Sequence, residues 1–139
     1  MALGFKRMTP TQANLRKLVV QSLELFSSEE AAFEYQQQVP IANVPAELFC
    51  WWFDDTYMPS SGVFCSAFTL QELRDLAAFN KVFESASSQI GEPPALLEQL
   101  FALPSWQQVA QSAQVALKSL GVAVPNKAFK RTGYACRLT

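Results

Sequence analysis

The chain has 139 residues and a formal net charge of −1, half of its residues are hydrophobic, and 11 Phe, 3 Trp and 3 Tyr make it rich in aromatic rings. This composition excludes a disordered chain, and the length suits one domain that buries about two-thirds of the surface exposed on unfolding. The sequence contains no histidine, which excludes serine–histidine, cysteine–histidine and histidine–metal chemistry within the chain.

Other functional classes are disfavoured by missing motifs. No apolar run approaches the roughly 18 residues of a membrane span, and the first residues lack the apolar stretch of a signal peptide. The cysteines, Cys50, Cys65 and Cys136, are odd in number and lack the C-x-x-C spacing of a zinc site. No glycine-rich phosphate-binding motif is present. We therefore expect a cytoplasmic protein with no cofactor, no metal and no catalytic residue that the sequence identifies.

The near-neutral total charge hides two different parts of the chain. Residues 1–125 hold 7 Lys/Arg and all 12 Asp/Glu, a net charge of −5, whereas residues 126–139 hold 4 Lys/Arg and no acid, a net charge of +4. This difference predicts a single domain at 1–125 followed by a basic carboxy-terminal extension at 126–139.

Helix signals begin near the amino terminus. Thr9-Pro-Thr-Gln12 is a capping box with proline at the first helical position, which predicts a helix start. One apolar face with helical spacing follows, made of Leu15, Leu18, Val19, Ser22, Leu23 and Phe26. Ser27-Ser-Glu-Glu30 repeats the capping pattern and predicts a second helix to about Gln38, whose inner face carries Ala31, Ala32, Tyr35 and Val39. Pro45 suits the first turn of a third helix.

The second half of the chain continues the helical pattern. After a turn at 58–62 and one helical turn at 63–68, the capping box Thr69-Leu-Gln-Glu72 predicts a helix over 70–88, which we expect at the centre of the fold. A short helix is expected over 94–103, with Leu96, Leu97, Leu100 and Phe101 buried. Ser105-Trp-Gln-Gln108 predicts the start of a last helix that ends at Gly121. Its apolar stripe has clean helical spacing and is made of Trp106, Val109, Ala110, Ala113, Ala116, Leu117 and Leu120. The β-like stretch 122–124 is too short to found a sheet. We predict an all-α fold, an irregular or orthogonal bundle of six or seven helices with no significant sheet.

Residues 49–59 combine five aromatic side chains, a thiol and two adjacent carboxylates. On a helix, Phe49, Trp52 and Phe53 share one face and are expected in the core. The candidate ligand- or partner-binding residues lie off that face: Glu47, Trp51, Asp54 and Tyr57. The two rings among them each carry a polar group that needs a partner when it is buried.

Asp54 and Asp55 are candidates for acid–base chemistry or for a hard cation, but adjacent helical side chains point about 100° apart. Glu47 and Asp54 share a face with Trp51 between them, which would suit a small acidic pocket with an aromatic wall. The alternative is that these carboxylates accept from backbone N–H groups or pair with a basic side chain such as Arg74.

The extension combines basic and aromatic side chains that could contact nucleic acid: Lys127, Phe129, Lys130, Arg131, Tyr134 and Arg137. The alternative is an extension that is flexible or lies against the acidic body. The sequence pI of about 5.4 favours that alternative, so nucleic-acid binding is not the leading expectation.

The extension begins Asn-Lys-Ala-Phe-Lys-Arg-Thr at residues 126–132 and resembles the ends of small bacterial proteins encoded by integron mobile gene cassettes. The resemblance implies that a recombination site in the DNA partly shaped residues 126–139. Residues 47–55, Glu-Leu-Phe-Cys-Trp-Trp-Phe-Asp-Asp, are also similar to a pattern in small uncharacterised bacterial helical proteins. Neither resemblance implies an activity or a catalytic residue.

Three functional hypotheses remain open. The first is a non-enzymatic helical module that binds a protein partner or itself through an aromatic patch near Trp51, Tyr57 and Met58. The second is a small-molecule or metal-binding helical protein, possibly an enzyme, that uses Glu47, Asp54 and Asp55 in a pocket. The third is nucleic-acid binding by residues 126–139, which truncation after Pro125 would abolish.

Overall fold

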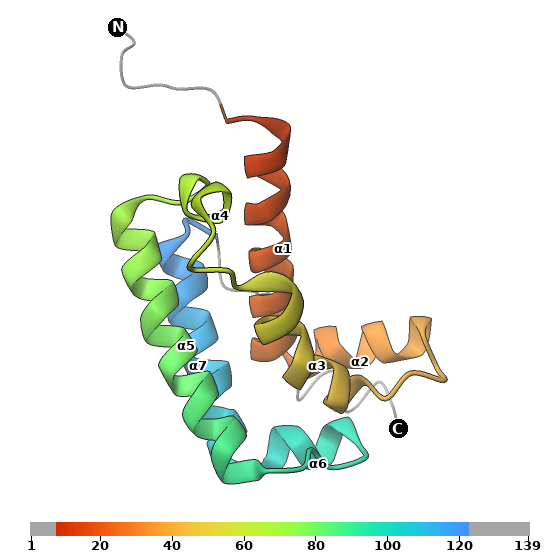
Figure 1. Ribbon diagram of the computed structural model, residues 1–139. Helices are drawn as coiled ribbons and strands as arrows, with labels where there is room; N and C mark the ends of the chain where they lie inside the picture. Colours follow the sequence, from red (N-terminus) through yellow and green to blue (C-terminus); the bar gives the residue numbers. More distant parts are fainter. Residues whose placement is uncertain (1–7, 123–139) are drawn as a thin grey trace, which may run out of the picture.

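The computed structural model describes residues 8–122, which form seven α-helices and one π-helical turn and contain no strand (Figure 1). The elements are α1 (Pro10–Ser27), α2 (Glu29–Gln38), α3 (Val44–Trp51), the π-helical turn η1 (Trp52–Thr56), α4 (Gly62–Ser66), α5 (Leu70–Ile90), α6 (Leu97–Ala102) and α7 (Pro104–Ser119). The predicted all-α bundle is confirmed. The predicted extension at 126–139 lies outside the described residues, so its separation from the helical domain stays a prediction.

Helix α7 is the centre of the bundle. It packs along both α5 and α1, whereas α1 and α5 contact each other far less. Figure 1 shows these three long helices along the length of the molecule, with α2 and α6 near one end and α4 near the other. The helix over 70–88, expected at the centre, therefore lies at the side of α7.

The core is a cluster of aromatic rings drawn from four elements, α1, η1, α5 and α7. Phe26 of α1 lies with its ring centroid 5.1 Å from that of Phe83 and 6.0 Å from those of Trp52 and Trp106. Phe79 and Phe83 of α5 also pack against Trp52, at 4.9 and 6.4 Å. All five rings are at most 1% exposed. Their burial holds η1 against α1, α5 and α7.

Two of the four predicted capping boxes form as expected. Thr9 and Thr69 each accept a hydrogen bond from the backbone N–H three residues later, and Gln12 and Glu72 reach back to the two cap N–H groups. The box predicted at Ser27 is displaced by one residue, because α1 continues through Ser27 and Ser28 is the cap of α2. Ser105 is not a cap, because Pro104 already occupies the first turn of α7.

Three residues expected in the core lie on the surface. Leu18 is 42% exposed and Leu96 is 53% exposed, the latter because it precedes α6, which begins at Leu97 rather than at residue 94. Phe53 is 38% exposed, although its ring stacks on Phe83 at a centroid distance of 5.1 Å. Phe53 therefore covers the core from outside and is not enclosed by it.

Within residues 8–122, every helix is too short or too polar to cross a membrane.

Candidate functional site

The candidate site is built on α3 and η1. Asn43 caps α3, its side-chain oxygen accepting from the Ala46 N–H at 3.2 Å, and Pro45 stands in the first turn, where its missing N–H is not needed. After Trp51 the chain widens into η1, in which the Tyr57 N–H donates to the Trp52 carbonyl, five residues back, at 2.9 Å. Such π-helical turns insert one extra residue and often occur at functional sites.

The inner side of this segment belongs to the core. Trp52 is fully buried, and its indole N–H donates to Asn80 Oδ1 at 2.9 Å. Tyr57 stacks on Trp52 with a centroid distance of 5.0 Å and also contacts Phe64. Burial, followed by the nearby Cys65 and Glu84, raises the pKa of the Tyr57 phenol above its ordinary value. Tyr57 is therefore a packing residue in this fold, although it is one of the predicted binding residues.

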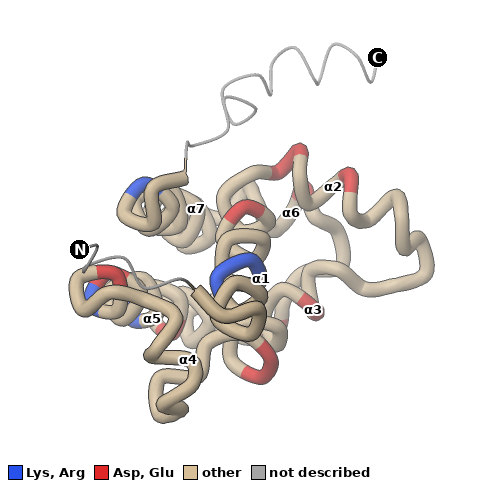
Figure 2. The backbone as a smooth tube through the Cα atoms, turned by 90° about the horizontal axis from the view of Figure 1, so that it is seen from above, with Lys and Arg blue, Asp and Glu red and all other residues tan. Residues whose placement is uncertain are grey.

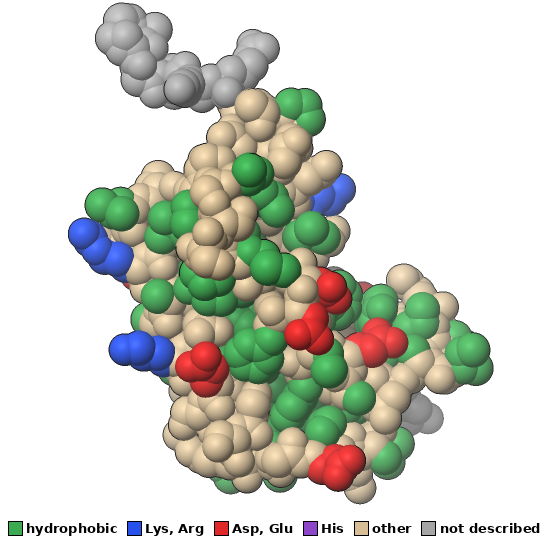
Figure 3. Space-filling model, in the orientation of Figure 1, with side chains coloured by type: hydrophobic (Ala, Val, Ile, Leu, Met, Phe, Trp, Pro, Cys, Tyr) green, Lys and Arg blue, Asp and Glu red, His purple; other side chains and the backbone are tan. Residues whose placement is uncertain are grey.

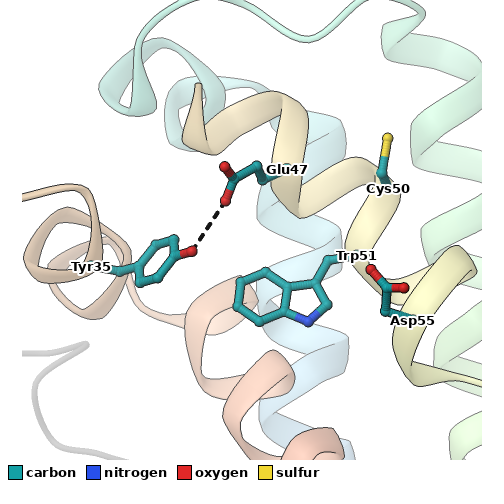
Figure 4. A pocket seen from close by; sticks show the side chains of 5 residues that line it. All are labelled: Tyr35, Glu47, Cys50, Trp51 and Asp55. Atoms are coloured by element: carbon teal, nitrogen blue, oxygen red, sulfur yellow. Dashed lines mark hydrogen bonds between the residues drawn. The ribbon is translucent and has the colours of Figure 1, made fainter. Parts of the chain in front are cut away.

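The outer side of the same segment faces a pocket of about 270 Å³ between α2 and α3 (Figure 4). Its lining consists of Tyr35, Glu47, Cys50, Trp51 and Asp55. The pocket thus brings together two of the predicted residues, Glu47 and Trp51. The carboxylate that joins them is that of Asp55, whereas Asp54 is exposed and does not line the pocket.

The π-helical turn explains the exchange of Asp54 for Asp55. In a regular α-helix, position 54 lies seven residues after Glu47, close to two full turns, so it shares a face with Glu47. The extra residue in η1 delays the rotation of the chain, so that position 55 arrives at that face instead. The carboxylate that shares the face of Glu47 is therefore eight residues after it and not seven.

Tyr35 of α2 completes the pocket wall. Its hydroxyl donates to Glu47 Oε1 at 3.1 Å, and its ring lies 5.7 Å from that of Trp51 at an angle of 51°. Burial, followed by the hydrogen bond to Glu47 and the charge of that carboxylate, raises the pKa of Tyr35 above its ordinary value. Tyr35 therefore keeps its proton and acts as a donor that fixes one oxygen of Glu47.

The sequence did not mark Tyr35 or Cys50 as site residues. The helical pattern predicts Tyr35 on the inner face of its helix, and the ring is half-buried, but its hydroxyl reaches Glu47 of α3. The sequence feature that could have marked Tyr35 as a site residue is its phenol hydroxyl, which needs a hydrogen-bond partner on a helix face whose other residues are apolar. Cys50 is exposed and lies one position before Trp51.

The charge around the pocket is of one sign. No Lys or Arg occurs between Lys17 and Arg74, the stretch that supplies every lining residue, whereas this stretch contains eight Asp/Glu. Figure 2 accordingly shows red without blue on α2 and α3, with the basic residues on α1, α5 and α7. On the face drawn in Figure 3, acidic side chains occupy the middle and the lower part and basic ones lie at the edges.

Among residues 8–122, Arg16 and Glu72 form an ion pair in which Nη1 and Oε1 are 2.7 Å apart. Both residues are remote from the pocket residues in the sequence. No group of three or more Cys, Asp or Glu side chains within the described range could hold a metal ion.

A second pocket, of about 530 Å³, lies between α2 and the start of α6. Its wall is formed mainly by apolar and amide side chains, and the amide of Gln36 already donates to the Val39 and Ala42 carbonyls at 3.1 and 2.9 Å. Although it is larger, this pocket has one carboxylate in its described lining, that of Glu98, and no Trp or Tyr ring, whereas the pocket at Trp51 has two carboxylates and both kinds of ring. Converging polar groups on an aromatic wall are the better mark of a binding site.

Comparison with known proteins finds no match: no family model, no curated protein and no solved structure is significantly similar to this chain.

Proposed function

We propose that this chain is a non-enzymatic helical binding protein and that the pocket formed by Tyr35, Glu47, Cys50, Trp51 and Asp55 is its binding site. The observation that supports the proposal is the convergence of two aromatic rings and two carboxylates in one open pocket. A pocket of this kind takes either a small molecule or one side chain of a partner protein.

The chemistry of the pocket favours binding over catalysis. Among the lining residues that the structure describes, Cys50 is the one thiol, and residues 18–73 contain no Lys, Arg or His that could activate it. Glu47 is already engaged by Tyr35. These features suit a static recognition site, and the proposal includes no bond-making step.

Of the aromatic patch predicted around Trp51, Tyr57 and Met58, the proposal retains Trp51 alone as a binding residue. Tyr57 stacks in the core, and Met58 is 38% exposed outside the pocket lining. Trp51 is the member of the patch that faces the pocket (Figure 4). The cassette origin implied by residues 126–132 is kept as a separate proposal, and a recombination site next to the gene in genomic DNA would test it.

The binding proposal is tested by saturation-transfer NMR of the full chain against a mixed collection of cationic, neutral and anionic metabolites and of capped amino acids, which stand in for the side chains of a partner protein. We expect a subset to bind and to lose binding in Trp51→Ala. The matched control is Met58→Ala, which removes an exposed apolar side chain outside the pocket. Circular dichroism checks that both variants stay folded, and Trp51→Phe, which keeps a ring, is the second variant. If no compound binds, or if binders are indifferent to Trp51, the proposal is wrong.

A further inference from the structure

The walls and the charges of the pocket at Trp51 favour the same kind of ligand. Tyr35 and Trp51 meet at an angle of 51° and form an aromatic corner, and Figure 4 shows Glu47 and Asp55 on opposite sides of Trp51. The face of an aromatic ring carries negative charge density and attracts cations, with tryptophan the strongest. Carboxylates beside the ring add to that attraction.

We infer that the ligand of this pocket is an organic cation, an alkylammonium group that packs on Trp51 and Tyr35 while Glu47 and Asp55 balance its charge. The inference rests on the proposed binding function and specifies its ligand class. The same chemistry is presented by a free quaternary amine and by a lysine side chain of a protein, methylated or not.

The hydrogen bond from Tyr35 prepares the pocket for this ligand. It engages Oε1 of Glu47 and leaves Oε2 with no hydrogen-bond partner among residues 8–122. Because the tyrosine donates to the carboxylate, the carboxylate is held in place without losing its negative charge to a basic neighbour. A cation that enters therefore meets a fixed carboxylate that no basic side chain of residues 8–122 pairs with.

Other ligand classes fit less well. An anion would be repelled by two carboxylates in a stretch of 56 residues, 18–73, that has eight acids and no base. Ca²⁺ and Mg²⁺ take six or more oxygen ligands, and the lining offers two carboxylates, one of which is bonded to Tyr35. A neutral apolar ligand would use the rings but would place the carboxylates against a group that cannot pair with them.

The charge of the whole described body acts in the same direction. Residues 8–122 contain 5 Lys/Arg and 12 Asp/Glu, a formal net charge of −7. A field of one sign raises the local concentration of oppositely charged ligands and their association rate, and salt screens it. The volume of about 270 Å³ lies just below the roughly 300 to 1,000 Å³ of drug-sized sites, which suits a cationic head group.

The test is an NMR titration of the full chain with choline and with its neutral carbon analogue, in which a quaternary carbon replaces the nitrogen. The readout is the indole N–H resonance of Trp51, assigned with Trp51→Phe. Trp52 and Trp106 are fully buried and serve as internal references. We expect choline to shift the Trp51 resonance to saturation and the neutral analogue to bind about tenfold more weakly.

The charge contribution is tested with isosteric variants. Glu47→Gln and Asp55→Asn are expected to weaken choline binding by about twofold to fivefold each, a range set by the partial solvent exposure of the carboxylates. Asp54→Asn removes the same charge one residue away, outside the pocket lining, and is expected to leave the affinity within experimental error.

Two peptide arms identify the source of the cation. A capped tripeptide with a central trimethyllysine is compared with one that contains the neutral norleucine. Tighter binding of the trimethyllysine peptide than of choline indicates a protein side chain, and the reverse indicates a free amine; either result supports the inference. Equal binding of charged and neutral probes overturns the inference but leaves the binding proposal intact. If none of these probes shifts the Trp51 resonance although other compounds of the mixed collection bind the pocket, the inference is wrong and the binding proposal stands. If no compound of the mixed collection binds either, the binding proposal itself is wrong.

Discussion

Two adjacent tryptophans differ completely in their surroundings. Trp52 is fully buried among Phe26, Phe79 and Phe83 and donates to Asn80, whereas Trp51 is half-buried and forms the wall of the pocket. The difference follows from position on the helix, because neighbouring residues point about 100° apart. At the residue scale, the binding proposal therefore assigns stability to Trp52 and ligand contact to Trp51.

Alanine substitution separates these two roles. Trp52→Ala should lower the free energy of unfolding by about 3 to 5 kcal/mol, because it opens a cavity in the aromatic core and leaves Asn80 without its donor. Trp51→Ala should cost less than half as much, since one side of its ring faces the open pocket. Urea unfolding of both variants measures the difference. Equal losses would contradict the placement of Trp51 at the pocket.

Glu72 is the carboxylate whose surroundings predict a dependence of stability on pH. Burial alone would raise its pKa, but hydrogen bonds from Arg16 and Thr69 and the Arg16 charge outweigh burial, and the pKa is lowered from the ordinary 4.5. A lowered folded-state pKa means that the contribution to stability is complete above the unfolded-state value and is lost as the pH falls through the folded-state value.

We therefore expect the free energy of unfolding to fall as the pH decreases below about 4.5 in the wild type, and to fall less in Glu72→Gln. Glutamine keeps the capping geometry, as Gln12 does at the start of α1, but cannot titrate. Chemical denaturation at several pH values measures both slopes. Identical slopes would exclude Glu72 as a source of the acid sensitivity.

At the scale of elements, the caps explain where the helices begin. Thr69 satisfies an N–H of the first turn of α5 and Glu72 satisfies the N–H of Thr69. In α7 the same sequence pattern fails, because Leu103 precedes Pro104 and the helix has started before Ser105. A capping pattern thus predicts a helix start only where no proline offers an earlier one.

This contrast gives a matched pair of substitutions. Thr69→Ala should lower the free energy of unfolding by about 1 kcal/mol, because it removes the acceptor at the start of α5. Ser105→Ala removes the same hydroxyl chemistry at a position that caps nothing, so its effect should stay within about 0.5 kcal/mol. Thermal and urea unfolding of the two variants, measured together, provide the check.

At the scale of the whole molecule, α7 joins the two sides of the bundle by packing against α1 and α5. Its buried face carries small residues, including Ala113 and Ala116, which let the neighbouring helices approach closely. Volume on this face is therefore limited.

Ala113→Leu should destabilise the fold by about 1 to 3 kcal/mol, because Ala113 is fully enclosed and the added carbons have no space. Val115→Leu, on the exposed side of the same helix, is the control and should have little effect. Urea unfolding measures both changes. A neutral Ala113→Leu would mean that the centre of the bundle is less closely packed than the structure indicates.

The sequence by itself determined the helical class, most of the helix bounds and the buried stripe of α7, because helical periodicity, caps and prolines act over a few neighbouring residues. It also located the candidate site on residues 47–57 and distinguished a core face from an outer face there. These are local properties, and the regular geometry of a helix is enough to derive them.

Only the tertiary structure decided which residues meet. Tyr35 reaches Glu47 because α2 folds back beside α3, and Asp55 replaces Asp54 because η1 inserts one residue into the turn. Trp52 of η1 packs on Phe26, Phe79 and Phe83, which lie far from it in the sequence, and no local pattern predicts such packing. The pocket is thus a product of long-range packing acting on a segment that the sequence had already marked.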